Sequence, residues 1–231
     1  MVVYLLEFRL HGYAKKYTKN LIYEVSRKFK ARGVTRKRAV PHITLYGPFT
    51  TKNQNAVISK IAKICKKYDL VPFKIAGFNY FNNYKNKVIY LNIKPSKKLE
   101  ELRREISKRL SGITHTKSSF DSRFNFYFHS TIAFKDIDKK FSNIYGYLKQ
   151  KEEPNINQHL LRVTILKGSK ILYEYDLMQK RLLNQKHAKN KALWRKTIGI
   201  LKQKTPDFKM DIEENQTLFE KILDYLKWYI R

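Results

Sequence analysis

Apolar residues follow two different spacings along most of the chain. Stretches of β-branched and apolar residues, often alternating with polar ones, are typical of strands, and apolar residues at every third or fourth position are typical of helices. This pattern predicts strands at residues 2–10, 42–49, 71–81, 87–93 and 124–134, and two more between residues 162 and 183. It predicts helices at residues 13–29, 55–68, 99–110 and 141–148.

The order of these predicted elements indicates the fold class. Strands and helices alternate through residues 2–110, and residues 124–183 repeat part of the same order. This arrangement predicts an α+β protein of two similar lobes. Gly33 follows the first predicted helix and would mark its end. The sequence has no G-x-G-x-x-G segment and no P-loop, so it indicates neither a dinucleotide enzyme nor an NTPase.

The character of the chain changes after residue 183, and we therefore expect a core of residues 1–183 followed by an extension of residues 184–231. Residues 185–196 are basic, residues 204–206 interrupt the pattern, and residues 211–230 carry apolar residues at the spacing of an amphipathic helix. Two roles are open for this extension. It can cover apolar surface of the core, or it can contribute to substrate binding.

The net charge changes this picture of an ordinary globular protein. The chain has 49 Lys and Arg residues against 19 Asp and Glu residues, a formal net charge of +30. Self-repulsion opposes folding at such a charge, so a polyanionic partner is expected. Nucleic acid fits better than a membrane, because the basic residues are spread over the whole chain and no apolar run approaches the roughly 20 residues that span a bilayer. The alternative is a basic composition without a ligand.

The single cysteine bears on the cellular compartment. Cys65 lies in a predicted helix and cannot form an internal disulfide, and residues 2–10 resemble a strand rather than a secretion signal. We therefore expect a reducing, cytoplasmic location. A lone cysteine on the apolar face of a helix is typical of a core residue, and a nucleophilic role is the less favoured interpretation.

Two of the six histidines share a local pattern. His42 and His129 are each followed two positions later by a threonine, Thr44 and Thr131, and then by an aliphatic residue. Side chains at positions i and i+2 of a strand lie on one face, so each histidine is expected beside its threonine, with the residue between them facing inward. A core histidine has no reason to recur with a threonine in two strands, so the pair indicates function.

The residue types suit the transfer of a phosphoryl group between oxygen atoms. This reaction needs one group to accept a proton from the attacking oxygen and another to donate one to the leaving oxygen, and imidazole supplies both forms near neutral pH. A threonine hydroxyl can donate a hydrogen bond to a non-bridging phosphate oxygen. A zinc site is less well supported, because no cysteine or carboxylate stands at ligand spacing beside these motifs.

These two segments resemble the two motifs of the 2H phosphoesterase superfamily, which includes 2′-5′ RNA ligase-like proteins and RNA 2′,3′-cyclic phosphodiesterases. The resemblance rests on Pro41-His42-Ile43-Thr44-Leu45 and on His129-Ser130-Thr131-Ile132. It implies a bilobal α+β fold of antiparallel strands and outer helices, with both motifs on facing strands of a central cleft. It also implies that the four motif residues form an active site without a metal or cofactor, with His42 as the acid and His129 as the base.

Candidate substrate-binding residues lie close to both motifs. Residues 27–38 include seven basic side chains and no acidic one, and Arg36, Lys37 and Arg38 end this run four positions before His42. We expect these three to bind phosphates, although a solvated basic surface is the competing interpretation. Tyr46 and Tyr127 each lie an even number of positions from the histidine of the motif in their strand. They are therefore expected on the same face as that histidine, which is the face of the cleft. There they can stack on a base of single-stranded RNA, or simply form the walls of the cleft.

Three functions compete on these grounds. The leading one is hydrolysis of a 2′,3′-cyclic phosphate at the end of a single-stranded RNA, which includes fragments of tRNA. The second uses the same residues on a 2′-5′ linkage, as a 2′-5′ RNA ligase, or on a small cyclic nucleotide; the large positive charge favours a polynucleotide. The third is a non-catalytic RNA-binding module, which would not need a matched acid and base.

Overall fold

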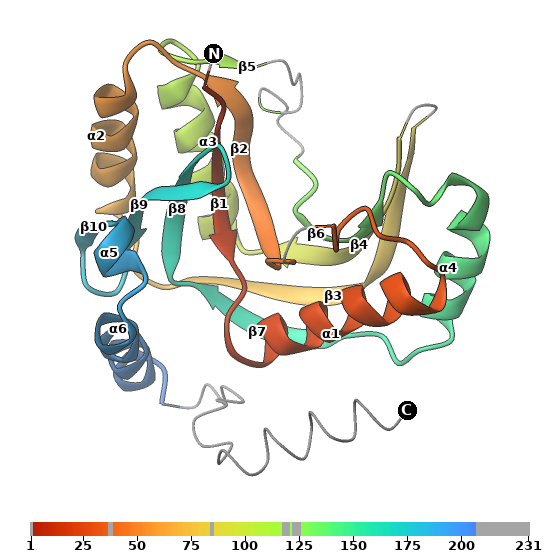
Figure 1. Ribbon diagram of the computed structural model, residues 1–231. Helices are drawn as coiled ribbons and strands as arrows, with labels where there is room; N and C mark the ends of the chain where they lie inside the picture. Colours follow the sequence, from red (N-terminus) through yellow and green to blue (C-terminus); the bar gives the residue numbers. More distant parts are fainter. Residues whose placement is uncertain (1, 37–38, 84–85, 117–120, 122–125, 207–231) are drawn as a thin grey trace.

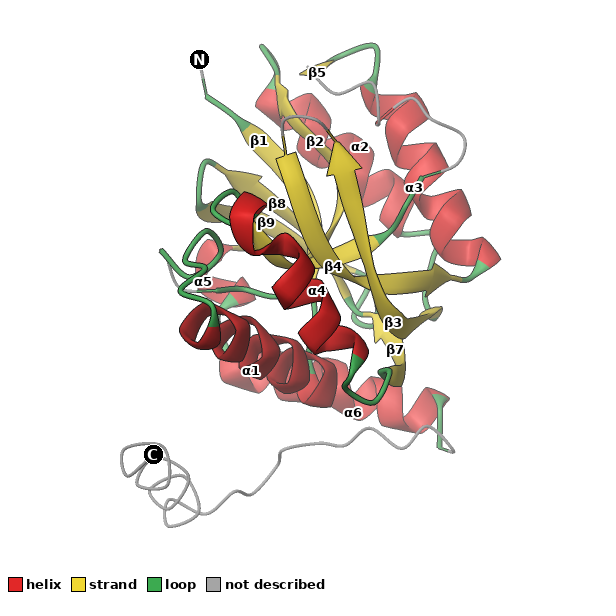
Figure 2. Cartoon of the chain, turned by 90° about the vertical axis from the view of Figure 1, so that its right-hand side faces the viewer, coloured by secondary structure: helices red, strands yellow, loops and turns green. Residues whose placement is uncertain are grey.

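The computed structural model describes residues 2–36, 39–83, 86–116, 121 and 126–206 of the chain. Two antiparallel β-sheets form its centre (Figure 1). Helices α1 and α4 lie on one side of the strands, and helices α2 and α3 lie on the other (Figure 2). The bounds of these helices are Gly12–Lys28 for α1, Gln54–Cys65 for α2, Lys97–Leu110 for α3 and Phe141–Lys149 for α4. The α+β class expected from the sequence is confirmed.

The larger sheet has six strands in the order β10-β9-β8-β1-β2-β5. Its strands are β1 (Tyr4–Arg9), β2 (His42–Thr50), β5 (His115–Thr116), β8 (Arg162–Lys167), β9 (Lys170–Asp176) and β10 (Arg181–Asn184). All adjacent strands are antiparallel. The central strand β1 therefore joins β2, which carries the first motif, to the hairpin of β8 and β9.

The smaller sheet has four strands in the order β6-β4-β3-β7, again all antiparallel. Its strands are β3 (Val71–Asn83), β4 (Asn86–Pro95), β6 (His129–Phe134) and β7 (Asn155–Leu160). The pairing of β3 with β4 is irregular between Ile75 and Phe78, where Gly77 has φ +80°. Strand β6, which carries the second motif, lies at one edge of this sheet and contacts β2 of the other sheet.

Local sequence explains where two of the helices begin. The side chain of Asn53 accepts a hydrogen bond from the backbone N–H of Ala56 at the start of α2, and Ser96 accepts one from Leu99 at the start of α3. Such caps satisfy an N–H group that has no partner within the helix. Cys65 is buried at the end of α2, and burial raises the pKa of its thiol, so the structure supports the core interpretation of this residue.

The pattern of apolar residues predicted most of the elements correctly. It missed strands β5, β7 and β10, the short 3-10 helix Asp138–Lys140, and helices α5 (Gln185–Ala188) and α6 (Lys191–Lys204). The expected strand at residues 124–134 begins only at His129, although the carbonyl oxygen of Phe128 already accepts a hydrogen bond from the N–H group of Ile93 in β4; residues 124 and 125 lie outside the described part. The expected amphipathic helix at residues 211–230 also lies outside it. The first helix ends at Lys28, and the positive φ that follows belongs to Lys30 rather than to Gly33.

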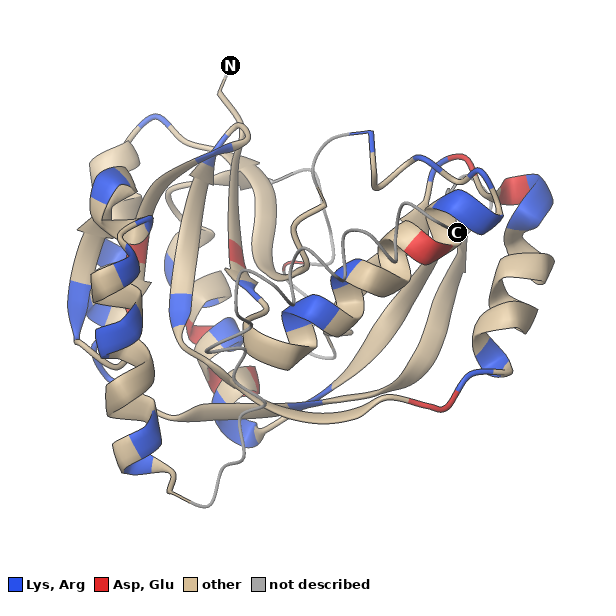
Figure 3. Ribbon diagram, turned by 60° about the horizontal axis from the view of Figure 1, so that its bottom comes forward, with Lys and Arg blue, Asp and Glu red and all other residues tan. Residues whose placement is uncertain are grey.

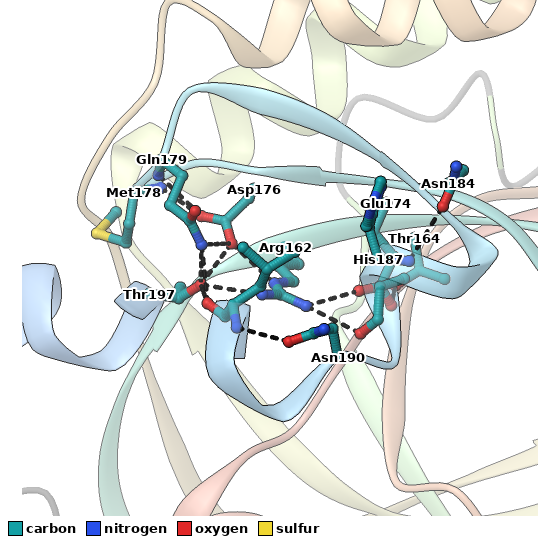
Figure 4. Close-up of polar contacts among 12 residues, drawn as sticks. Arg162, Thr164, Glu174, Asp176, Met178, Gln179, Asn184, His187, Asn190 and Thr197 are labelled. Atoms are coloured by element: carbon teal, nitrogen blue, oxygen red, sulfur yellow. Dashed lines mark hydrogen bonds and ion pairs between the residues drawn. The ribbon is translucent and has the colours of Figure 1, made fainter. Parts of the chain in front are cut away.

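Residues beyond 183 are joined to the core by buried polar contacts (Figure 4). The guanidinium group of Arg162 donates hydrogen bonds to Asp176, Glu174 and the hydroxyl of Thr197, which lies on α6. The side-chain amide of Gln179 also donates to Thr197, at 2.9 Å. Helix α6 therefore covers one end of the six-stranded sheet through a set of paired charges and hydrogen bonds, which satisfy one another in the buried environment.

Lys and Arg residues are distributed over many helices and strands rather than gathered on one element (Figure 3). Among the residues that the structure describes, no helix is long and apolar enough to cross a membrane.

Candidate active site

The first motif lies at the beginning of β2. Ile43 and Leu45 are fully buried, whereas His42 and Thr44 are partly exposed, as the alternation of a strand predicts. The ring nitrogen Nδ1 of His42 donates a hydrogen bond to the carbonyl oxygen of Val40, at 2.8 Å. Because a carbonyl can only accept, Nδ1 carries a proton and Nε2 is the nitrogen left for chemistry.

The second motif repeats this geometry at the beginning of β6. Ser130 and Ile132 are buried, and His129 and Thr131 are partly exposed. Nδ1 of His129 donates to the carbonyl oxygen of Tyr127, at 2.9 Å. In both motifs the histidine is thus held by the carbonyl group two residues earlier, and in both motifs Nε2 is left for proton transfer.

Packing of one sheet against the other brings the two motifs together. Strands β2 and β6 contact each other, although they belong to different sheets. The charge of His42 is also close enough to lower the pKa of His129. The structure therefore unites the two histidines that the sequence singles out, and each stands beside its threonine.

The surroundings of the two imidazoles differ. Rings of Phe81 and Tyr90 lie 5.0 and 5.1 Å from the ring of His129, between centroids. Burial among such groups lowers the pKa of His129; the hydrogen bond to Tyr127 acts in the opposite direction, and the proximity of His42 lowers the pKa further. The neutral form of His129 is therefore favoured near neutral pH.

His42 has a charged environment instead. Its Nε2 lies 3.7 Å from the carboxylate of Glu7, a buried residue of β1, and the same carboxylate accepts a hydrogen bond from Arg9 at 2.9 Å. The sequence pattern did not indicate Glu7, Arg9, Phe81 or Tyr90, because each of them reaches the site through pairing between strands. The signal that would have found them is the register of β1 with β2 and of β4 with its two neighbours β3 and β6.

A cavity of about 250 Å³ lies beside the second motif. Its lining includes Asn92 of β4, Arg103 of α3, and the loop residues Phe126, Tyr127 and Phe128. Arg103 is almost completely buried, with its guanidinium group 4.1 Å from the ring centroid of Phe126 and one N–H bonded to the carbonyl oxygen of Asp121. The cavity thus combines aromatic rings with a guanidinium group close to His129.

The five expected substrate-binding residues are placed differently. Tyr127 is 65% exposed, so one face of its ring is available to a ligand. Tyr46 is only 1% exposed, and its hydroxyl forms a 2.8 Å hydrogen bond with Thr114, so its position does not fit the expected stacking role. Arg36 is exposed in the loop before β2. Lys37 and Arg38 lie outside the described residues.

Two further histidines, His11 and His159, are buried and belong to neither motif. Nε2 of His11 lies 2.9 Å from the carbonyl oxygen of His159, and burial lowers the pKa of His11 to about 4. Its ring contacts Trp194 of α6, so His11 belongs to the packing of that helix against the core. Within the described part of the chain, no group of three or more His, Cys, Asp or Glu side chains is placed to hold a metal ion.

Comparison with known protein families identifies the relatives of this chain. Residues 20–170 match the model of the 2′-5′ RNA ligase superfamily, and this range contains both His-x-Thr motifs. The chain belongs to this superfamily. The resemblance to 2H phosphoesterases seen in the sequence is thereby confirmed. Comparison with curated proteins gives no match.

Solved structures resemble this member of the superfamily at low sequence identity. Usb1 from Kluyveromyces marxianus is 10% identical, and the alignment covers 79% of this chain and 96% of Usb1 with a TM-score of 0.43. LigT from E. coli, solved with ATP, is 13% identical, and the alignment covers 78% of this chain and 92% of LigT with a TM-score of 0.45. A phosphoesterase is 10% identical, with coverages of 80% and 94% and a TM-score of 0.45.

Proposed function

We propose that the protein hydrolyses a 2′,3′-cyclic phosphate at the end of an RNA strand by acid–base catalysis with His42 and His129. The observation that carries this proposal is the repeated geometry of the two motifs. Each imidazole donates its Nδ1 proton to a backbone carbonyl and keeps Nε2 for proton transfer, and the two rings are close enough to interact electrostatically.

The reaction needs one neutral and one protonated imidazole. Nε2 of His129 accepts a proton from water while the water oxygen forms a bond to phosphorus. The bond from phosphorus to one ribose oxygen breaks, and protonated His42 donates its Nε2 proton to that oxygen. The products are a phosphomonoester and a free ribose hydroxyl, and solvent exchange then returns the proton from His129 to His42.

The lowered pKa of His129 supports its assignment as the base. Ion-pair contact with Glu7 supports His42 as the acid, because the protonated ring has a carboxylate within 3.7 Å. Thr44 and Thr131 lie on the same faces as the histidines and are partly exposed. Their hydroxyls are suited to donate hydrogen bonds to the non-bridging oxygens, where negative charge increases in the transition state.

The charge of +30 favours a polynucleotide over a mononucleotide as substrate. The exposed ring of Tyr127, the cavity beside it and Arg36 offer contacts for nucleotides next to the scissile phosphate. The same residues also suit a 2′-5′ linkage or its formation in the reverse direction. A pure RNA-binding module would not require two imidazoles with their Nε2 atoms left for proton transfer.

The direct test uses purified protein and an RNA oligomer that ends in a 2′,3′-cyclic phosphate. We expect hydrolysis in the presence of EDTA, and a loss of turnover of at least about a hundredfold in His42→Ala and in His129→Ala, the usual size of a general acid or base contribution. RNA affinity should change little in both variants. Full activity in either variant would contradict the two-histidine mechanism, and strict dependence on added zinc or magnesium would indicate another class of enzyme.

A further inference from the structure

Glu7 is a buried carboxylate of β1 that lies beside His42. It is 2% exposed, and its two oxygen atoms have different partners. Oε1 accepts a 2.9 Å hydrogen bond from Nε of Arg9, and Oε2 lies 3.7 Å from Nε2 of His42. A buried carboxylate is costly unless cations or donors surround it, so its partners indicate what it is for.

The register of β1 and β2 fixes this arrangement. Glu7 lies opposite Thr44, and Arg9 lies opposite His42, so all four side chains share one face of the six-stranded sheet. Glu7 therefore lies diagonally across from His42 and directly across from the threonine of the first motif. The backbone pairing of β1 with β2 fixes this placement, which therefore does not depend on a loop.

Strand β8, on the other side of β1, supplies no cation to Glu7. Thr164 lies opposite Glu7, and its hydroxyl donates to Glu174 at 2.9 Å. The nearest basic residue of that strand, Arg162, is bonded to Glu174 and Asp176 (Figure 4). The carboxylate of Glu7 is thus shared between Arg9 and His42.

His129 has no equivalent of Glu7. In the described part of the chain no ion pair joins it to a carboxylate, and the aromatic rings of Phe81 and Tyr90 lie 5.0 and 5.1 Å from its ring, between centroids. The two motifs are alike in sequence and in their Nδ1 hydrogen bonds, and they differ in this one charged contact. An anion beside a site for phosphate opposes substrate binding, so the contact with His42 calls for a separate explanation.

We infer that Glu7 is a positioning residue that holds the ring of His42 and balances the charge of its protonated form, which makes His42 the proton donor. Arg9 orients the carboxylate and shields the substrate phosphate from it. This inference rests on the proposed function for its catalytic consequence, but the interaction itself can be measured without substrate.

The test is an NMR titration of the histidine ring signals in the full-length protein. The signal of His42 is identified by its absence from the spectrum of His42→Ala. In Glu7→Gln, which keeps the shape of the side chain and removes its charge, the pH of half-protonation of His42 should fall, because the anion beside the protonated ring is lost. In Arg9→Gln it should rise, because a cation that competes for the carboxylate is removed.

The control is Glu153→Gln, which changes the net charge equally at an exposed carboxylate paired with Lys149. The titration of His42 should not move in this variant. An unchanged midpoint in Glu7→Gln would overturn the inference. If Glu7→Gln does not fold, Arg9→Gln is the deciding variant. An unchanged or lowered pH of half-protonation of His42 in Arg9→Gln would also contradict the inference that Arg9 and His42 share the carboxylate of Glu7.

The kinetic consequence distinguishes this inference from the proposed function. On a 2′,3′-cyclic phosphate, Glu7→Gln should lower kcat about tenfold with little change in KM, and the alkaline limb of the pH profile should move to lower pH. A wild-type protein without this activity would refute the proposed function and leave the titration result standing. Wild-type activity with an identical pH profile in Glu7→Gln would refute the inference alone.

Discussion

At the residue scale, the two imidazoles are held in the same way because the constraint is local. Each Nδ1 donates to the carbonyl oxygen two residues earlier, at the entry to a strand. A repeated His-x-Thr segment carries this information in three consecutive positions, so the sequence alone was enough to single out His42, Thr44, His129 and Thr131 as candidate site residues. Contacts made across strands, such as that of Glu7 with His42, depend on a register that the pattern of apolar residues does not contain.

Tyr46 shows where local alternation fails. It has the same parity as His42 and Thr44, yet both Leu45 and Tyr46 are buried. The pairing of β1 with β2 is irregular around Leu6. At such an irregularity an extra residue interrupts the strict alternation of faces, so Tyr46 no longer lies on the same face as His42 and Thr44. Tyr46 therefore packs against Phe49 and bonds to Thr114. A single shift in register turns a predicted ligand-binding ring into a core residue.

The aromatic rings around His129 make its titration a testable property. Burial lowers the pKa of His129, and the base must be neutral, so kcat/KM should increase as pH rises through a value below the ordinary 6.5. Phe81→Ala admits water to this ring and should move the acidic limb of the pH profile towards higher pH. The adjacent Tyr80→Ala is the matched control, because Tyr80 packs against Phe141 and Tyr145 instead. Equal shifts in both variants would contradict this explanation.

At the scale of elements, the loop between α1 and β2 is fixed by residues that follow β6. Asp136 accepts hydrogen bonds from the backbone N–H groups of Arg32, at 2.7 Å, and of Gly33, at 2.9 Å. Gly33 also passes so close to the backbone of Phe134 that an added Cβ would lie 1.9 Å from its carbonyl oxygen. The glycine expected to end a helix therefore allows two segments of the chain to approach each other.

Removal of this contact should loosen the loop that carries Arg36. We expect Asp136→Ala to raise KM for an RNA oligomer while kcat stays nearly constant, because the histidines do not depend on it. Two N–H groups lose their acceptor, at a cost of about 1 kcal/mol in the free energy of unfolding. Kinetics on the oligomer and denaturant unfolding measure the two effects. A fall in kcat at unchanged KM would contradict the separation of loop and catalytic strand.

The pH dependence of that variant follows from the same contact. Burial acts to raise the pKa of Asp136, but the hydrogen bonds from the backbone N–H groups of Arg32, Gly33 and Asp136 itself, together with the charge of Arg36, outweigh it, and the pKa is lowered. A lowered carboxyl pKa stabilises the fold above the ordinary value for aspartate and loses this effect as pH falls through the folded-state value. The difference in unfolding free energy between wild type and Asp136→Ala should therefore shrink in acid.

Elements with a clear apolar pattern were predicted, and those held by polar contacts were missed. Strand β7 has a largely polar sequence, and its burial comes from pairing with β3. Helix α6 buries Thr197, Ile198 and Leu201, a narrow face within a basic segment, and Asn190 caps its beginning. Its place in the fold depends on the hydrogen bonds of Thr197 with Arg162 and Asp176. No periodicity of apolar residues records such a network.

At the scale of the whole molecule, two similar lobes were expected, and the two sheets differ in size. Six strands form one sheet and four form the other, because β10 and the short β5 extend the larger sheet at its two edges. The sequence predicted the strands that carry both motifs, and their meeting across two sheets came from tertiary packing. The net charge of +30 is the one global property that can be read directly from the sequence, and its role can be measured.

The salt dependence of RNA binding separates a polynucleotide enzyme from one that acts on small nucleotides. If Arg36, Lys37 and Arg38 contact phosphates beyond the scissile one, each contact releases counterions, and affinity for RNA falls steeply with salt. The triple substitution to alanine should flatten the salt dependence by up to about three contacts and raise KM on an oligomer. Turnover at saturation should hardly change, since these contacts are equal in the ground and transition states. A 2′,3′-cyclic mononucleotide has no additional phosphates and should be processed almost equally well.

A matched control removes the same charge elsewhere. Lys191, Arg195 and Lys196 are exposed on α6, and their joint replacement by alanine lowers the net charge by the same amount. If only long-range attraction matters, both triple variants should lose the same affinity for the oligomer. Direct phosphate contacts near the first motif predict a larger loss of affinity in the variant of residues 36–38. Equal losses of activity on the oligomer and on the mononucleotide would mean that residues 36–38 act by positioning the catalytic strand. Unchanged activity on both substrates would mean that these residues form a solvated basic surface. Measuring apparent affinity and KM at several salt concentrations distinguishes these outcomes, because only bound phosphates change the slope.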